Sequence, residues 1–228
     1  DFLSSIVFAN GRLTYISEKD GYRHIYLYGQ TGALQKQLTK GAFDVTRLLA
    51  VDPQTNSVFY EAADESPLRR NIYKINMAKG NSIKLSAGQG YNSATFSNNG
   101  KFFVLRHSDI QTPAQISLHD ANGKLLRMLE DNQATAQKIV EARLPQKEFI
   151  VVTAADGVTE LNGWILKPAN FDASKKYPLV MVQYSGPNSQ EVTDRFGIDW
   201  EYALLNEGFL VACVDGRGTG ARGEEFRK

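Results

Sequence analysis

Short apolar runs alternate with polar turns through the first half of the chain, and the pattern repeats. Runs in which every second residue is apolar are typical of strands with one buried face. Turns followed by such runs begin at residues 10–15, 55–60 and 99–104, at intervals of roughly 45 residues. Further runs follow in each repeat, at 24–28, 71–75 and 114–118 and again up to residues 39, 86 and 129. Antiparallel units of about four strands at this spacing predict the blades of a β-propeller.

We expect about three of these blades, the third of them partial. Propellers close with roughly four to eight blades, so three would leave strand edges unpaired. Either further blades precede residue 1 or another chain covers the edges, and we favour further blades.

A helix is predicted where the repeats end. Residues 131–133 can cap a helix over 134–143, and Pro145 would follow its end. The buried face of this helix would consist of Ala136, Ile139, Val140 and Leu144. Two runs at 148–153 and 159–166, separated by a short polar turn, then predict an antiparallel pair of strands.

The apolar pattern changes in the last quarter of the chain. Residues 179–182 and 209–214 are continuous apolar runs, which predict strands that are buried on both faces of an α/β sheet. Residues 200–207 between them predict a helix, with Gly208 as its C-terminal cap. Strand, helix and strand at this spacing form a βαβ unit. Tyr184 stands at the carboxyl end of the first strand, where open α/β sheets place their ligands.

Charge and composition give no sign of nucleic-acid binding, a disulfide, a metal site or a cofactor site. The chain has 228 residues with 26 basic and 25 acidic side chains and a net charge of +1, so its electrostatics give no reason to expect nucleic acid as a partner. Cys213 is the only cysteine, which excludes an internal disulfide, and its apolar surroundings predict an inert buried thiol. Glu191, Asp194 and Asp199 do not form a recognisable metal set, and no cofactor motif is present.

Several motifs, in this order and spacing, carry a resemblance to a known family. They are Glu18-Lys19-Asp20-Gly21-Tyr22-Arg23-His24-Ile25, Leu129-Glu130-Asp131-Asn132, Lys176-Tyr177-Pro178, Gln183-Tyr184-Ser185-Gly186-Pro187 and Asp215-Gly216-Arg217-Gly218-Thr219-Gly220. Together they resemble the dipeptidyl peptidase IV family, a branch of the prolyl oligopeptidase class of serine peptidases. The resemblance implies a β-propeller joined to an α/β-hydrolase domain. Residues 1–144 would form the C-terminal blades and a connecting helix, and residues 145–228 the start of the hydrolase domain.

The catalytic triad of such an enzyme is absent from these residues. No G-x-S-x-G nucleophile elbow occurs, and all three histidines lie in the repeat region, whereas α/β-hydrolases place serine, acid and histidine in that order. The triad would therefore begin beyond Lys228, and the chain alone would be inactive.

One catalytic residue is implied by the resemblance. Tyr184 matches the tyrosine that donates its hydroxyl to the oxyanion of the tetrahedral intermediate in this family. The alternative is that Tyr184 only packs at the end of a strand. Residues 215–218 have two interpretations as well: they shape the wall of an active site, or they form a structural turn in which Asp215 pairs with Arg217. We favour the structural turn.

The resemblance implies the function of the parent protein. It would be a serine exopeptidase that releases N-terminal dipeptides with proline or alanine second, with a peptide as substrate and the rest of the parent polypeptide as partner. Two alternatives stay open: another member of the prolyl oligopeptidase class, such as an oligopeptidase or an acylaminoacyl peptidase, and a non-catalytic binding homologue. The substrate-binding residues are unknown and are expected outside these 228 residues. The resemblance also implies an extracytoplasmic location and allows a homodimer.

Overall fold

Three four-stranded antiparallel sheets make up the first part of the computed structural model, which describes residues 6–9 and 11–228. Asn10, where the first predicted repeat begins, lies outside the described residues. The first sheet contains β1 (Ile6–Ala9), β2 (Arg12–Ser17), β3 (His24–Tyr28) and β4 (Leu34–Gln37). The second contains β5 (Val45–Asp52), β6 (Ser57–Ala62), β7 (Asn71–Asn76) and β8 (Ser82–Lys84). The third contains β9 (Tyr91–Phe96), β10 (Phe102–Ser108), β11 (Gln115–Asp120) and β12 (Leu125–Glu130).

Neighbouring strands in each sheet follow chain order, as in propeller blades. The predicted strands are the second, third and fourth of each sheet, and the pattern missed the first. In β5 the apolar alternation is interrupted because the pairing with β6 shifts register between Val45 and Arg47 and again between Leu48 and Ala50. The prediction that the third unit is partial was wrong, because β9 completes it.

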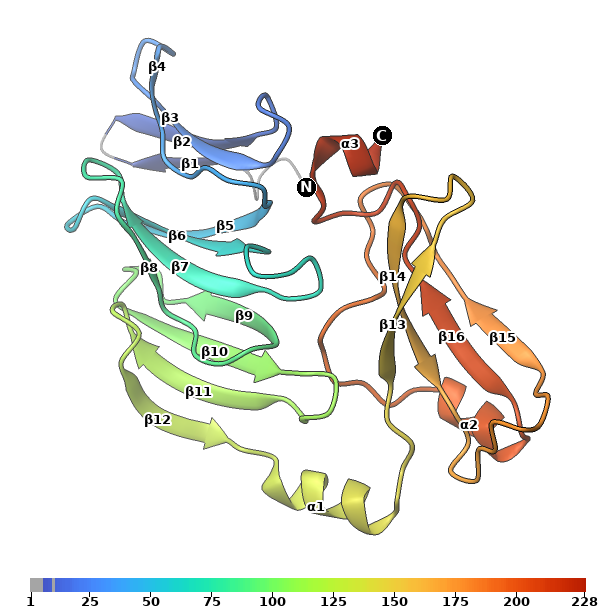
Figure 1. The fold of residues 1–228 in the computed structure, drawn as a ribbon. Helices are drawn as coiled ribbons and strands as arrows, with labels where there is room; N and C mark the ends of the chain where they lie inside the picture. The colour runs from blue at the N-terminus through green and yellow to red at the C-terminus, as the bar shows by residue number, and fades with distance from the viewer. Residues whose placement is uncertain (1–5, 10) are drawn as a thin grey trace.

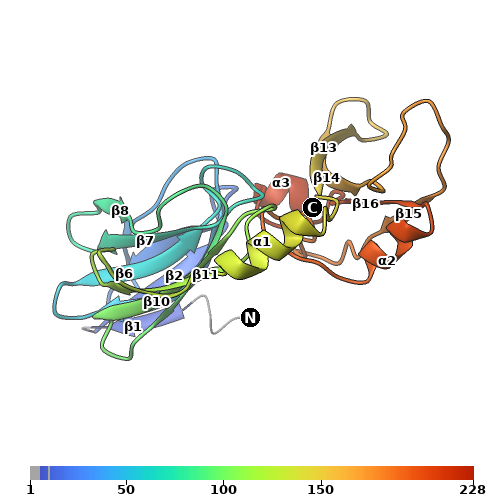
Figure 2. The ribbon, with the colours of Figure 1, turned by 90° about the horizontal axis from the view of Figure 1, so that it is seen from below.

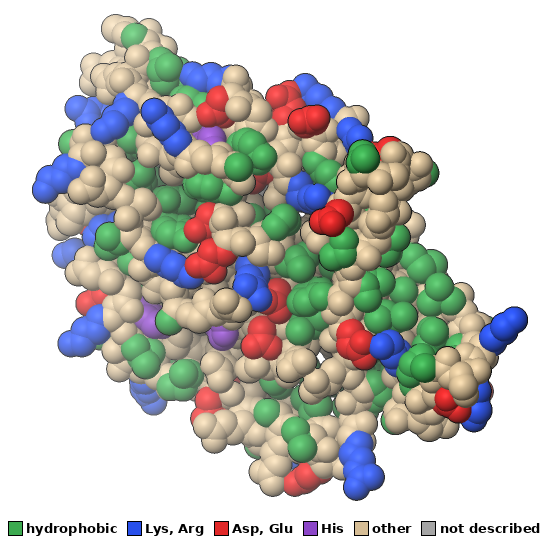
Figure 3. Space-filling view, in the orientation of Figure 1, with side chains coloured by type: hydrophobic (Ala, Val, Ile, Leu, Met, Phe, Trp, Pro, Cys, Tyr) green, Lys and Arg blue, Asp and Glu red, His purple; other side chains and the backbone are tan. Residues whose placement is uncertain are grey.

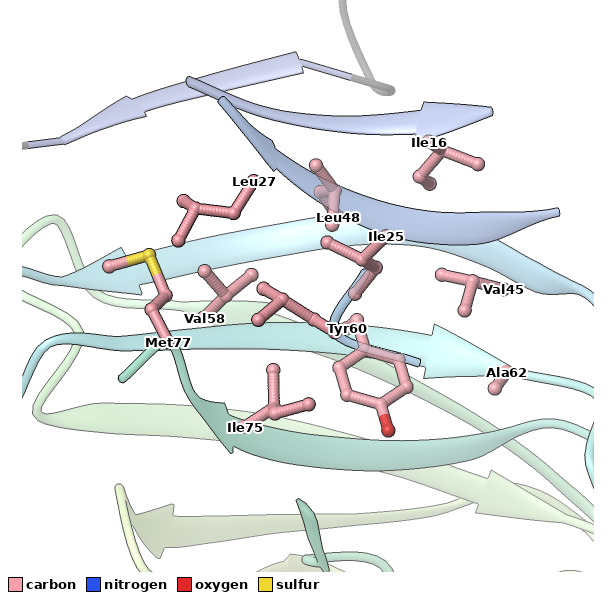
Figure 4. Packing of buried hydrophobic residues seen from close by; sticks show 11 residues of the cluster. Ile16, Ile25, Leu27, Val45, Leu48, Val58, Tyr60, Ala62, Ile75 and Met77 are labelled. Atoms are coloured by element: carbon pink, nitrogen blue, oxygen red, sulfur yellow. The ribbon is translucent and has the colours of Figure 1, made fainter. Parts of the chain in front are cut away.

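The core of this region lies between the sheets, which stack one on another (Figure 1). Side chains from the first and second sheets meet in one buried cluster, shown in Figure 4. A second cluster joins the second and third sheets around Phe59, Ile72 and Phe103. Because successive side chains of a strand point to opposite faces, β6 contributes Val58 and Tyr60 to one cluster and Phe59 to the other. Every residue of β6 is buried.

The predicted connecting helix is present as α1 (Gln133–Glu141), but its expected buried face is not buried. No residue of α1 is buried, and Val140 is 72% exposed. The helix crosses between the stacked sheets and the rest of the chain, so it has no sheet to pack against (Figure 2). Asn132 occupies the N-cap position, yet its side chain donates to the Ala114 carbonyl at 2.5 Å instead of capping the helix.

A fourth, mixed sheet follows α1, with the order β13-β14-β16-β15. The antiparallel pair is confirmed as β13 (Glu148–Thr153) and β14 (Glu160–Leu166). β15 (Leu179–Val182) and β16 (Leu210–Val214) run parallel, joined through α2 (Glu201–Asn206), which confirms the predicted strand–helix–strand unit. Gly208, just past α2, has a positive φ of 80°, as a C-terminal glycine cap requires.

The expectation that the strand at 179–182 is buried on both faces was wrong for this chain. β15 is an edge strand, and Leu179 and Met181 are 52% and 48% exposed. Hydrophobic side chains gather on the visible face over the mixed sheet (Figure 3). The other face packs on a cluster that includes Trp164, Leu205 and Cys213.

The mixed sheet stands beside the stack of three sheets, and α3 (Gly223–Arg227) lies next to the first of them (Figure 1). No helix formed by the described residues has both the length and the apolarity needed to span a bilayer.

Candidate functional site

Tyr184 lies in a turn that directly follows β15, which we name the Tyr184 turn (residues 184–187). Its side chain is 72% exposed. Ser185 has a left-handed φ of 51°, and Ser189 closes the turn by donating its backbone N–H to the Gly186 carbonyl at 3.0 Å and its hydroxyl to the same oxygen at 2.6 Å. Tyr184 thus stands at the carboxyl end of a parallel strand, as predicted, and it is largely exposed.

Gly186 sets the position of the Tyr184 ring. A Cβ atom at residue 186 would lie 2.5 Å from Cε1 of Tyr184 and 3.2 Å from its hydroxyl oxygen. The first distance is shorter than real Cβ contacts and the second is tight, so the ring in this position occupies space that a glycine leaves open. The tyrosine therefore lies across the backbone of its own turn.

The loop after β16, residues 215–220, is hydrogen-bonded to the chain that follows the Tyr184 turn. Asn188 donates its backbone N–H to the Gly218 carbonyl at 2.9 Å, and Gly220 donates to the Ser189 carbonyl at 2.9 Å. A Cβ at Gly220 would lie 2.9 Å from Oδ1 of Asn188, which explains why a glycine stands there. The two loops at the carboxyl ends of β15 and β16 thus form one unit.

Asp215 binds backbone rather than a cation, which corrects the predicted pair with Arg217. Its carboxylate accepts the N–H groups of Glu191 at 3.1 Å and Val192 at 2.9 Å. Arg217 points elsewhere: its guanidinium lies 3.9 Å from Asp156. Burial raises the pKa of Asp215, and its two hydrogen bonds oppose that rise. Asp215 therefore has a structural role in this loop, with other partners than predicted.

The chain just after this unit contacts the stacked sheets, and we name this contact the seam: Gln190 and Asp194 against residues 67–70, which lie between β6 and β7. Asp194 is 4% exposed and donates its backbone N–H to the Leu68 carbonyl at 2.8 Å. One carboxylate oxygen of Asp194 lies 2.8 Å from Nε of Arg69, and the other accepts the N–H of Ile110 at 2.9 Å.

Gln190 makes the second half of the seam. Its amide donates to the Pro67 carbonyl at 2.7 Å, and its oxygen accepts a hydrogen bond from Arg70. Arg70 is 6% exposed, lies 3.9 Å from Glu61 and stacks its guanidinium over the Tyr91 ring. A cavity of about 220 Å³ adjoins this contact, lined in part by Arg47, Arg70, Asn188 and Gln190.

A further contact between the same two regions lies at α3. Gly223 donates its N–H to Asp44 at 3.1 Å, and Arg227 pairs with Glu18 on the first sheet. This ion pair lies at the same end of the mixed sheet as the Tyr184 turn: Glu18, Arg227 and Asn188 line one cavity of about 420 Å³.

The remaining candidate groups have local structural roles. His24 and His119 each hydrogen-bond a hydroxyl and a backbone carbonyl within their own sheet, and His107 contacts the Asn92 side chain at 3.0 Å. Burial raises the pKa of the Cys213 thiol to about 12, which keeps it protonated and inert. Within residues 6–9 and 11–228 no cluster of three His, Cys, Asp or Glu side chains could hold a metal ion.

Comparison with known proteins places these features in a family. Residues 3–114 match the model of the dipeptidyl peptidase IV N-terminal region. The chain superimposes on the crystal structure of Porphyromonas gingivalis dipeptidyl peptidase 4 with a TM-score of 0.92 and 48% identity, covering 100% of this chain and 32% of that one. The chain belongs to the dipeptidyl peptidase IV family.

Curated members of the dipeptidyl peptidase IV family match over nearly the whole chain. Prolyl endopeptidase FAP of Bos taurus is 33% identical over 239 residues, which cover 99% of this chain and 31% of that protein. Dipeptidyl peptidase 4 of Trichophyton equinum is 30% identical over 235 residues, which cover 99% of this chain and 30% of that protein. The chain therefore spans about a third of the length of these relatives.

Sequence reasoning identified Tyr184 but missed the seam. Asp194 was considered only as an acidic neighbour of Glu191 and Asp199, and Gln190 not at all. Their partners Arg69 and Arg70 lie 125 and 120 residues earlier in the chain. No periodicity or short motif reports such a contact, so only the three-dimensional structure of this family member reveals it.

Proposed function

We propose that this chain supplies the last propeller blades and the opening of the α/β-hydrolase domain of a serine dipeptidyl peptidase. The boundary would fall between residues 144 and 145, after α1. The whole enzyme would release N-terminal dipeptides with proline or alanine second. Family membership, the three propeller-like sheets and the parallel pair β15 and β16 support this proposal.

Tyr184 is the proposed oxyanion donor. In the reaction a serine supplied by the rest of the parent polypeptide attacks the scissile carbonyl, a histidine takes the serine proton, and negative charge develops on the carbonyl oxygen. A neutral phenol held in a fixed turn can donate to this oxygen without reorganising, which stabilises the transition state more than the substrate. The observation that carries the assignment is the exposed Tyr184 hydroxyl at the carboxyl end of β15, held over Gly186.

Cleavage of a Gly-Pro chromogenic substrate by the full-length parent protein tests this function. Tyr184→Phe removes only the hydroxyl, and loss of one oxyanion donor costs about 10²–10³-fold in kcat. Tyr177→Phe is the matched control: its hydroxyl, near the start of the same strand, accepts the N–H of Asp172 at 2.8 Å and would not face the substrate. We expect Tyr177→Phe to retain most activity.

Three other outcomes would change the proposal. Equal cleavage by the parent and by Tyr184→Phe would make Tyr184 a packing residue. Cleavage of internal or acylated substrates, without dipeptide release, would indicate another member of the prolyl oligopeptidase class. A folded parent without any hydrolysis would indicate a binding homologue.

We also propose, from the family relationship, that the parent protein works outside the cytoplasm and forms a homodimer. Cell fractionation and light scattering of the purified parent protein test these two points separately. A cytoplasmic monomer with dipeptidyl peptidase activity would overturn both and leave the proposed chemistry intact.

A further inference from the structure

We infer that Gln190 and Asp194 are positioning residues for Tyr184, because they fasten the chain behind the Tyr184 turn to the propeller-like sheets. The inference rests on the proposed oxyanion role of Tyr184. It assigns the stacked sheets a part in the chemistry: they would fix where the tyrosine hydroxyl stands.

The first support is that Asp194 is buried and that its backbone N–H and its carboxylate are all hydrogen-bonded. Its backbone N–H and both carboxylate oxygens are engaged, by residues of two different sheets or their connections: Leu68 and Arg69 after β6, and Ile110 after β10. A buried carboxylate with a cation and a backbone donor is fixed in position, since any displacement leaves a charge unpaired. Asp194 therefore holds its segment at the junction of the second and third sheets.

The second support is the bond between Gln190 and Arg70. The guanidinium of Arg70 is buried and held on several sides: it donates to the carbonyls of Pro67 at 3.0 Å and Arg69 at 2.7 Å and lies over Tyr91. Gln190 contacts both Arg70 and the Pro67 carbonyl. Its amide thus binds the connection between β6 and β7, at a backbone carbonyl and at a buried guanidinium that is itself held in place.

The third support is the short path from the seam to the tyrosine. Only Asn188 and Ser189 separate Gln190 from the Tyr184 turn, and both are hydrogen-bonded to the loop after β16 or to the turn itself. Asp215 fixes the next two residues of the segment, Glu191 and Val192, through their N–H groups. With no free residue in between, a shift of Gln190 is passed on to the turn. Catalytic groups need such support, since a displacement of about 1 Å can cost about 10²-fold in rate.

The inference predicts a coupling that packing alone would not produce. If Gln190 and Asp194 act through the Tyr184 hydroxyl, their removal slows the reaction only while that hydroxyl is present. If they merely hold two parts of the fold together, their removal harms the enzyme to the same degree with or without it. A double-mutant cycle separates these cases.

The experiment uses the full-length parent protein and the Gly-Pro substrate. Gln190→Ala and Asp194→Asn are each made alone and together with Tyr184→Phe. In the presence of Tyr184 we expect kcat to fall about 10–100-fold with KM nearly unchanged, because the tyrosine is misplaced in the transition state. In the Tyr184→Phe background we expect a further loss of about twofold or less.

Two additional variants sharpen the cycle. Gln190→Glu keeps an acceptor for Arg70 and loses the donor to Pro67, so it should recover much of the rate lost in Gln190→Ala. Lys167→Gln removes an exposed ion pair with Glu148 at the opposite end of the mixed sheet from the Tyr184 turn, and we expect it to leave kcat within about twofold, because exposed ion pairs contribute little. Thermal unfolding of every variant checks that it is folded, and Gln190→Ala carries the test if Asp194→Asn does not fold.

The outcomes distinguish the inference from the proposed function. Equal losses in both backgrounds, or an effect on KM alone, would overturn the inference and leave the oxyanion role of Tyr184 standing. No effect of Tyr184→Phe itself would overturn the proposed function, and the positioning role with it.

Discussion

The second and the fourth sheet each have four strands, yet they differ sharply in burial. β6, an inner strand of the second sheet, is buried at all six positions, whereas β14, an inner strand of the mixed sheet, is buried at only three of seven. The second sheet has another sheet on each face, and the mixed sheet has α2 and its small cluster on one face only. Four paired strands are therefore not a stable unit in themselves: their stability depends on what covers them. The proposed catalytic residue belongs to the less covered region.

Two truncations to alanine, one in each sheet, test this difference in burial. The one in the second sheet should have the largest effect on stability of the variants predicted here. Phe59 is fully buried, with its ring 4.4 Å from that of Phe96, so Phe59→Ala should lower the free energy of unfolding by about 3–5 kcal/mol. Met181 in the edge strand β15 is half exposed, and Met181→Ala should change the free energy of unfolding by about 0.5 kcal/mol or less. Urea unfolding of the 228-residue chain measures both. Equal losses would mean that the mixed sheet is as well packed as the second sheet.

A substitution in the Tyr184 turn should separate activity from stability. In Gly186→Ala the new Cβ would meet the Tyr184 ring at 2.5 Å, and the exposed ring can swing away at little cost to the fold. We expect the full-length protein to lose about 10–100-fold in kcat, because the hydroxyl leaves its position. The free energy of unfolding should change by about 0.5 kcal/mol or less.

Gly197→Ala is the control for this substitution. No atom lies within 4 Å of a Cβ built at Gly197, so this variant should keep both activity and stability. A Gly186→Ala enzyme with full activity would show that the position of the ring over Gly186 is irrelevant to catalysis.

The sequence predicted the strands whose apolar pattern is regular and missed those whose pattern is interrupted. Strands with regular alternation, such as β3 and β7, were predicted because their pattern is local. β5 was missed because its bulges break that pattern, and β9 because Tyr91 to Phe96 mixes small and polar residues with few apolar ones. The place of Tyr184 directly after β15 was predicted as well, because the end of a strand and the turn that follows it are local structure. Its role as an oxyanion donor stays a prediction.

Burial and long-range contacts were harder to predict. The apolar residues of β15 and α1 correctly indicate surfaces suited to burial, but a pattern cannot say whether a neighbour is present to bury them. Asp215 was assigned the nearest cation along the chain, Arg217, although its partners are backbone N–H groups 23 and 24 residues away. The seam joins residues more than a hundred positions apart, and such contacts are decided by how the sheets stack.

The smallest predicted effect uses pH to compare the two regions, since all three histidines lie in the stacked sheets. Burial lowers the pKa of His107 in β10, while Asp109 and Asp194 oppose the shift. A lowered pKa means that the fold favours the neutral ring. The stabilising contribution is therefore fully present above the unfolded value of about 6.5 and is lost as the pH falls through the lower folded value.

Urea unfolding of the 228-residue chain between pH 8 and pH 5 measures this contribution. The free energy of unfolding should decrease towards pH 5, and His107→Gln, which cannot take up the proton, should make that decrease smaller. At pH 5, hydrogen exchange should show that the amides of β10 and its neighbour β9 lose protection before those of β14 and β16, because only the stacked sheets contain His107. If the free energy of unfolding depends on pH identically in the unsubstituted 228-residue chain and in His107→Gln, His107 does not distinguish the two regions. Acid would then act on the carboxylates that both regions contain.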